Sequence, residues 1–174
     1  MPATPIPTFS VFLPQVATSY SMLKEKAALI ENLGFDGLWL IDHMWQGGPD
    51  VDCFEGWTAL SALAEATERL RLGLLVTCNS FRHPALLAKM AATADHISGG
   101  RLELGMGAGW MEEEHRAYGW DFPEVGVRLG QLEESLEIIT GLFKNERTTL
   151  GGSHYRLLDA PFSPKPLQDP LPIT

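Results

Sequence analysis

The sequence predicts an α/β fold in which about four consecutive β/α units form a parallel sheet. Three observations support this prediction. Short apolar runs alternate with segments whose apolar residues recur at helical spacing. The connections between them are only a few residues long, as expected for right-handed β–α–β crossovers. The inner runs are apolar on both faces, which is typical of buried parallel strands.

Four runs are the expected strands: residues 9–13, 38–41, 70–77 and 102–106. The first strand ends at Pro14, which has no N–H to donate to a neighbouring strand. The second reads LWLI and follows a helix that stops at Gly34. The third reads LRLGLLVT, and the fourth leads directly into a glycine-rich stretch. Each run is therefore taken as one continuous strand.

Four segments are the expected helices: residues 19–33, 54–68, 84–97 and 128–143. Thr18, Ser19 or Ser21 could cap the first helix, and Pro84 suits the first turn of the third. In the last helix, Leu129 and Leu132 begin an apolar stripe. Such a stripe indicates a face that packs on the core rather than a ligand site.

The C-terminal part departs from the β/α alternation. Residues 146–174 are expected to form a hairpin, turning at Gly151-Gly152, and then a proline-rich tail. The last residues, Leu171 to Thr174, lead toward a further strand. We treat residues 1–174 as a single domain whose first and fourth strands would have open edges.

Composition excludes several kinds of protein. A hydrophobic content of 45% fits a globular domain, and no apolar run approaches the ~20 residues of a membrane span. A net charge of −9 argues against nucleic acid or an anionic membrane as partner. Residues 1–7 resemble a cytoplasmic start with no leader. Cys53 and Cys78 are expected to be free thiols, and no metal site is expected.

Asp42 and His43 follow the second strand directly. Parallel sheets bind ligands at the carboxyl ends of their strands, and histidine exchanges protons near neutral pH. Neighbouring residues of a regular strand point to opposite faces, so one of the pair would act and the other would orient it. The alternative is purely structural, with a capping aspartate and a hydrogen-bonded histidine.

The stretch GMGAGW follows the fourth strand at residues 105–110. Its glycines would let the backbone approach a flat ligand closely, or could serve only to pack the sheet. It is not a dinucleotide fingerprint, and the three carboxylates Glu112, Glu113 and Glu114 disfavour a phosphate at this turn.

A third segment, CNSFRHP, joins the third strand to the third helix. Asn79 and Ser80 could hydrogen-bond a heterocycle, or either could cap the helix. Arg82 could neutralise an anion or be solvated. His115 and His154 have no companions at metal-ligand spacing, and we assign them no role.

These segments, together with the helix LEESLEIITGLF, resemble the bacterial-luciferase-like oxidoreductases. They resemble most closely the branch that uses the deazaflavin coenzyme F-420. The resemblance extends from Phe9 to Ile173 and implies a (β/α)8 TIM barrel, of which this chain would supply the N-terminal half. A whole barrel takes ~250 residues.

The resemblance also implies roles for individual residues. His43 would be the acid or base beside the coenzyme ring, and Asp42 would support it. A cis peptide bond at Leu75–Val76 would lie behind the ring. The residues along the two edges of the ring would be Thr77, Cys78 and Asn79 on one side and Gly107, Ala108, Gly109 and Trp110 on the other.

Two positions depart from the sugar-phosphate dehydrogenases of this family. Trp110 stands where they have a glutamate, and Gly47 stands where they have a tryptophan. A sugar phosphate is therefore not the expected substrate, and Trp110 suggests a bulkier, less polar pocket.

Three functions follow as hypotheses. The first is hydride transfer between the deazaflavin and a small organic substrate. The second is an FMN-dependent monooxygenase of the same family. The third is a non-catalytic half barrel that acts as a structural partner. In each case we expect a homo-oligomer that forms through the open barrel edges.

Overall fold

A computed structural model describes residues 8–48 and 50–174. Residues 1–7, which the sequence analysis interprets as a cytoplasmic start, and Pro49 lie outside these ranges. The strands that carry the fold are β1 (Ser10–Phe12), β2 (Gly37–Leu40), β3 (Arg71–Leu74), β4 (Thr77–Cys78), β5 (Leu102–Glu103) and β6 (Met106–Gly107). The α-helices are α1 (Tyr20–Asn32), α2 (Gly56–Glu65), α3 (Pro84–Ser98), α4 (Glu112–Tyr118) and α5 (Val125–Lys144).

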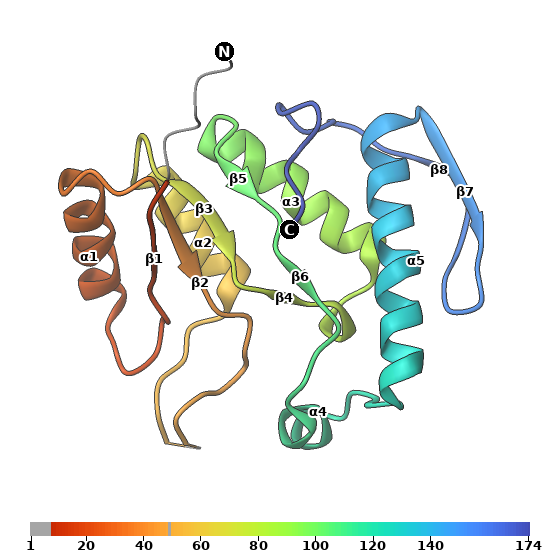
Figure 1. Cartoon of the computed structure of the whole chain (residues 1–174), viewed down its shortest axis with the longest axis horizontal. Coiled ribbons are helices and arrows are strands. Elements are labelled where there is room, and N and C mark those ends of the chain that lie inside the picture. Colours follow the sequence, from red (N-terminus) through yellow and green to blue (C-terminus); the bar gives the residue numbers. More distant parts are fainter. Residues whose placement is uncertain (1–7, 49) are drawn as a thin grey trace, which may run out of the picture.

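The sheet is parallel, which confirms the predicted fold class. The order of its strands is β1-β2-β3-β5, and β4 pairs in parallel with β6 beyond it. Leu38 of β2 lies beside Val11 of β1 and Leu72 of β3. In Figure 1 the strands run from top to bottom, so their carboxyl ends lie toward α4. Helices α2 and α3 lie behind the strands in this view, while α1 and α5 flank them.

Local signals start and stop α1 and α3 close to where the sequence predicts. The Ser19 side chain accepts a hydrogen bond from the N–H of Met22 and so caps α1. Pro84 occupies the first turn of α3, and Gly99 ends this helix with φ +68°. The α2 helix begins two residues later than expected, because the Glu55 side chain accepts the N–H groups of Trp57 and Thr58.

The core lies between the sheet and the helices. Alternate strand residues that face the helices are fully buried, among them Leu38, Leu40 and Leu72. They pack with Leu23 of α1 and Leu87 of α3 in one apolar cluster. The helices therefore cover one face of the sheet, and the concave face opposite them carries Trp39, which is only half-buried.

Two strands that the sequence presents as continuous are broken. Residues 70–77 contain β3, a cis peptide bond at Leu75–Val76, and then β4. Residues 102–106 divide in the same way into β5 and the first residue of β6. Apolar periodicity reports burial and does not register such a break in backbone pairing. The cis bond itself confirms what the family resemblance implies.

The C-terminal segment forms an antiparallel hairpin from β7 (Arg147–Gly151) and β8 (Arg156–Pro161), which packs beside α5 (Figure 1). Beyond it the chain returns to the sheet. Leu104 forms a parallel bridge with Ile173, and the N–H of Met106 donates to the carbonyl of Thr174. The fourth strand therefore does not have the open edge that we expected, because the last residues pair with it.

In the part of the chain that the structure describes, no helix is both long and apolar enough to cross a membrane. Cys53 and Cys78, which both lie in that part, are free thiols, as their spacing predicts.

Candidate functional site

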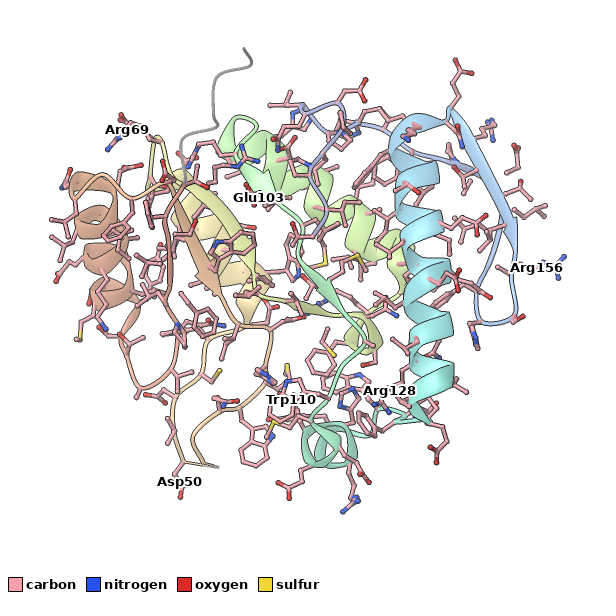
Figure 2. All side chains as sticks on the ribbon, viewed as in Figure 1. Asp50, Arg69, Glu103, Trp110, Arg128 and Arg156 are labelled. Atoms are coloured by element: carbon pink, nitrogen blue, oxygen red, sulfur yellow. The ribbon has the colours of Figure 1, made fainter. Side chains whose placement is uncertain are left out.

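A cavity of about 140 Å³ opens where the strands end, on the side of α4. Figure 2 shows Trp110 on this side of the molecule, near the lower edge of the view. The cavity brings together three segments that are far apart in the sequence. Its lining residues are Asp42, His43, Leu75, Val76, Cys78, Phe81, Gly107, Gly109, Trp110, Met111, Glu114 and His115.

His43 is held by a carboxylate that the sequence analysis did not select. Its Nδ1 lies 2.9 Å from Oε2 of Glu114, 71 residues away in the chain. Glu114 is fully buried, whereas the His43 side chain is 15% exposed. Oε1 of Glu114 also accepts the backbone N–H groups of Met44 and Trp45. The short helix α4 thus carries a buried acceptor to the end of β2.

Asp42 does not support His43, contrary to our prediction. Its carboxylate accepts two hydrogen bonds from Arg82, at 2.6 and 2.9 Å, and one from the N–H of Cys78, at 2.7 Å. Burial alone would lower the pKa of Arg82, but the hydrogen bonds to Asp42 outweigh it and raise that pKa. Arg82 is therefore neither solvated nor available to an anion. This pair fastens the end of β4 to the end of β2.

A second histidine, His115, also belongs to the cavity lining. Its Nδ1 is 2.8 Å from the Met111 carbonyl and its Nε2 is 2.6 Å from Oγ of Ser80. The thiol of Cys78 lies 3.2 Å from the same Oγ. Burial raises the pKa of this thiol, so it remains protonated at neutral pH. His115 itself is fully buried and packs against Phe81.

The floor of the cavity is apolar and partly open. Leu75 and Val76 are 48% and 37% exposed, although both are large aliphatic residues beside the sheet. Glycine is required next to them, because a Cβ at Gly107 would lie 2.5 Å from Cγ2 of Val76. Trp110 is 69% exposed, and its ring meets that of His43 edge-on with centroids 5.5 Å apart. Leu75 and Val76 form an exposed apolar surface, here called the shelf, that a flat ring could cover.

Three of the predicted ring contacts are not among the residues that line this cavity. Thr77 is fully buried, and Ala108 is half-buried. Asn79 is also buried, and its amide nitrogen donates to the hydroxyl of Tyr155 in the hairpin at 3.4 Å. Thr77 Oγ1 and Asn79 Oδ1 have no hydrogen-bond partner within the described residues.

The sequence indicates no structural role at the site for three residues that have one: Arg82, Glu114 and His115. Glu114 was seen only as one of three consecutive carboxylates. The three differ in burial, since Glu112 and Glu113 are exposed and Glu114 is not. A helical spacing signal could have separated them, because Glu114 and His115 follow Met111 by three and four residues and share its face.

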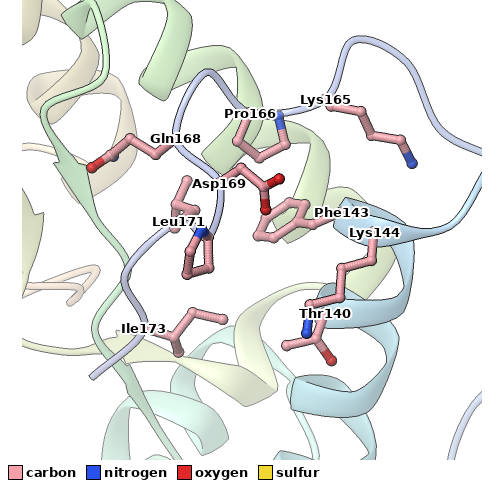
Figure 3. Close-up of a pocket in the computed structure, with 10 residues that line it drawn as sticks. Thr140, Phe143, Lys144, Lys165, Pro166, Gln168, Asp169, Leu171 and Ile173 are labelled. Atoms are coloured by element: carbon pink, nitrogen blue, oxygen red, sulfur yellow. The ribbon is translucent and has the colours of Figure 1, made fainter.

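A larger cavity, of about 380 Å³, lies between the end of α5 and the C-terminal tail. Figure 3 shows its walls, which come from Thr140 to Lys144 and from Lys165 to Ile173. Two of its polar side chains make hydrogen bonds within the fold: Nζ of Lys165 donates to the Leu142 carbonyl, and Gln168 donates to Asp95. No group of histidine, cysteine or acidic residues that could hold a metal ion is found there or elsewhere in residues 8–48 and 50–174.

Residues 7–174 match the model of a family described as luciferase-like monooxygenase. An F420-dependent glucose-6-phosphate dehydrogenase of Amycolatopsis mediterranei (strain U-32) is 34% identical over 87% of this chain and 46% of its own length. An FMNH(2)-dependent dimethylsulfone monooxygenase of Pseudomonas putida is 35% identical over 68% of this chain and 32% of its own length. The chain thus spans about half the length of the curated relatives it matches, or less.

Solved structures of similar fold are also covered only to about half of their length. An F420-dependent secondary alcohol dehydrogenase, in complex with an F420-acetone adduct, superposes with a TM-score of 0.86 at 25% identity, over 95% of this chain and 51% of that one. The coenzyme F420-dependent tetrahydromethanopterin reductase of Methanopyrus kandleri superposes with a TM-score of 0.82, over 95% of this chain and 49% of that one. At 22% identity, this second likeness shows the fold alone.

Proposed function

Because the chain belongs to the luciferase-like monooxygenase family, we propose that it supplies half of the active site of a deazaflavin-dependent oxidoreductase. The reaction is hydride transfer between coenzyme F-420 and a small organic substrate. The observation that carries the proposal is a histidine beside an exposed apolar shelf at the strand ends. F420-dependent relatives at 34% identity support the choice of coenzyme.

The residues present fit such a coenzyme. A deazaflavin ring is flat, with polar groups along its edges, and Leu75, Val76 and Gly107 offer its face a surface without charge. Cys78 and His43 would lie along its edge, as members of the same cavity lining. When bound, the ring supplies the hydride donor or acceptor. In this proposal the chain supplies the apolar surface under the ring and the group that exchanges a proton with the substrate.

His43 is the proposed acid or base, since its Nδ1 is held by Glu114 and its ring lines the cavity. Asp42 has a different role from the one the sequence suggested. By holding Arg82 and the N–H of Cys78, it fixes the geometry of the strand ends on which the ring would lie. Trp110 would form the wall on the substrate side, because it is exposed and adjoins His43.

An FMN-dependent monooxygenase is the second candidate. The 35% identity to a dimethylsulfone monooxygenase that uses reduced FMN supports it. The shelf of Leu75 and Val76 would accept either ring, because both coenzymes carry a flat tricyclic system.

Calorimetric titration of the full-length protein with coenzyme F-420 and, separately, with FMN tests the proposal. We expect F-420 to bind more tightly than FMN. Preference for FMN would overturn it in favour of the monooxygenase. Binding of neither coenzyme would overturn both and favour a non-catalytic structural partner.

We also propose that a second copy associates along β1, whose outer edge pairs with no strand in the described part of the chain. Light scattering tests this, and a monodisperse monomer would contradict it. The two free thiols support a reducing, cytoplasmic location.

A further inference from the structure

We propose that Glu114 is a positioning residue that fixes the tautomer of His43, placing the proton on Nδ1 and presenting Nε2 to the cavity. The inference rests on the proposed role of His43 as the acid or base. It assigns a task to a residue of α4 that neither the sequence pattern nor the comparisons single out. It also explains why a carboxylate in the lining of the cavity is fully buried.

The two oxygens of Glu114 have separate partners. Oε1 accepts the N–H groups of Met44 and Trp45, the latter at 3.4 Å. Oε2 faces Nδ1 of His43 at 2.9 Å. A carboxylate carries no proton and therefore only accepts hydrogen bonds. Nδ1 of His43 must therefore be the donor.

The consequence falls on the other ring nitrogen. A neutral imidazole has one N–H, so Nε2 carries the lone pair when Nδ1 carries the proton. Within residues 8–48 and 50–174, Nδ1 is the only ring nitrogen of His43 that makes a hydrogen bond. Since the ring lines the cavity, Nε2 is the atom left to take a proton from a substrate hydroxyl or return one to a carbonyl oxygen.

Among the residues that the structure describes, no other side chain is placed to hold Nδ1 of His43 in place of Glu114. Asp42 is engaged with Arg82 and with the N–H of Cys78. The thiol of Cys53 contacts the backbone carbonyl of His43 and not its ring. Glu114 also acts on the charged state, because an ionised carboxylate stabilises the imidazolium that forms when Nε2 takes a proton.

The substitution Glu114→Gln gives a sharp test, because glutamine keeps the size but has only one acceptor oxygen. The N–H groups of Met44 and Trp45 require that oxygen. The amide NH2 must then face Nδ1 of His43, which becomes the acceptor. We expect the proton to move to Nε2, and the ¹⁵N resonances of the two ring nitrogens to exchange their characteristic positions in histidine-labelled full-length protein.

The resonances of His43 are identified by their loss in His43→Gln. His115 is an internal reference, because the Met111 carbonyl fixes its tautomer independently of His43. Glu113→Gln is the matched control, since this neighbour on α4 is exposed and undergoes the same chemical change. It should leave every histidine tautomer unchanged. Glu114→Asp should retain the Nδ1–H tautomer, because a carboxylate remains.

The NMR measurement needs neither coenzyme nor substrate, so it decides the role of Glu114 even if the proposed reaction fails. Wild-type protein with the proton on Nε2 of His43 would overturn the inference, as would an unchanged tautomer in folded Glu114→Gln. In the active enzyme, the same substitution should lower kcat about 100-fold with little change in KM for the coenzyme. An equal loss in Glu113→Gln would also overturn it.

Discussion

The two histidines at the cavity, His43 and His115, have the same side chain but different surroundings. His115 is fully buried, and both of its nitrogens have partners in the fold, Ser80 and the Met111 carbonyl. His43 is 15% exposed and is held through one nitrogen by Glu114. A ring bonded at both nitrogens is part of the scaffold, whereas a ring bonded at one is oriented and still available for proton transfer. Partners, rather than position in the sequence, distinguish the two.

Replacing His43 should produce the largest effect. In His43→Gln we expect kcat to fall about 10²- to 10⁴-fold, because a positioned acid or base contributes this much to a proton-transfer step. The unfolding midpoint in urea should change little, since the glutamine amide can donate to Oε2 of Glu114 in place of Nδ1. Steady-state kinetics with coenzyme F-420, together with urea unfolding, measure both quantities. A large loss of stability with retained kcat would remove the distinction between the two histidines.

Replacing His115 should have the opposite pattern. Phenylalanine fills similar space but removes the hydrogen bonds to Ser80 and Met111. We expect His115→Phe to lower the free energy of unfolding by about 2 kcal/mol, because two partly buried partners lose their bonds to the fully buried histidine. The kcat of the folded fraction should stay within about twofold of wild type. A tenfold lower kcat at unchanged stability would instead place His115 in the chemistry.

A third substitution sharpens the comparison by acting far from the cavity. Glu31, at the end of α1, accepts the N–H groups of Glu68, Arg69 and Leu70 before β3 begins. Burial acts to raise the pKa of Glu31, but these hydrogen bonds outweigh it and lower the pKa. The stabilisation is therefore present above the ordinary glutamate pKa and is lost as pH falls through the lower, folded value.

We expect Glu31→Gln to cost about 1 kcal/mol at pH 7, a figure that allows for the solvent screening of this exposed carboxylate. The difference from wild type should shrink as the pH falls below the ordinary glutamate pKa, while the pH profile of kcat stays the same. Urea unfolding at a series of pH values measures the first effect. A shifted pH profile of kcat would contradict the prediction, because it would show that Glu31 also affects the groups that titrate at the cavity.

Much of the fold was predictable because burial leaves a periodic trace. The alternation of strands and helices, the caps at Ser19 and Gly99 and the approach of residues 171–174 to a further strand all depend on local patterns. The positions of Asp42 and Gly107 were also predictable, since the carboxyl ends of parallel strands meet at one edge.

The partners within the site were not predictable in this way. Glu114 meets His43 across 71 residues, and nothing in the local pattern near either one indicates the other. Helix α4, which delivers Glu114, is only seven residues long and carries no apolar stripe. Adjacency in the sequence also misled us, because Asp42 stands next to His43 but bonds with Arg82. Long-range side-chain pairs depend on tertiary packing that spacing does not encode.

The concave face of the sheet has a consequence for spectroscopy. The indole of Trp39 lies across Gly73 of the next strand. A Cβ at that glycine would collide with the indole ring. The indole is half-buried and faces away from the helices. A variant that keeps Trp39 as its only tryptophan would therefore carry a single fluorophore on the concave face of the sheet. Its emission would move to shorter wavelength when a ligand, or another protein surface, displaces water from that face.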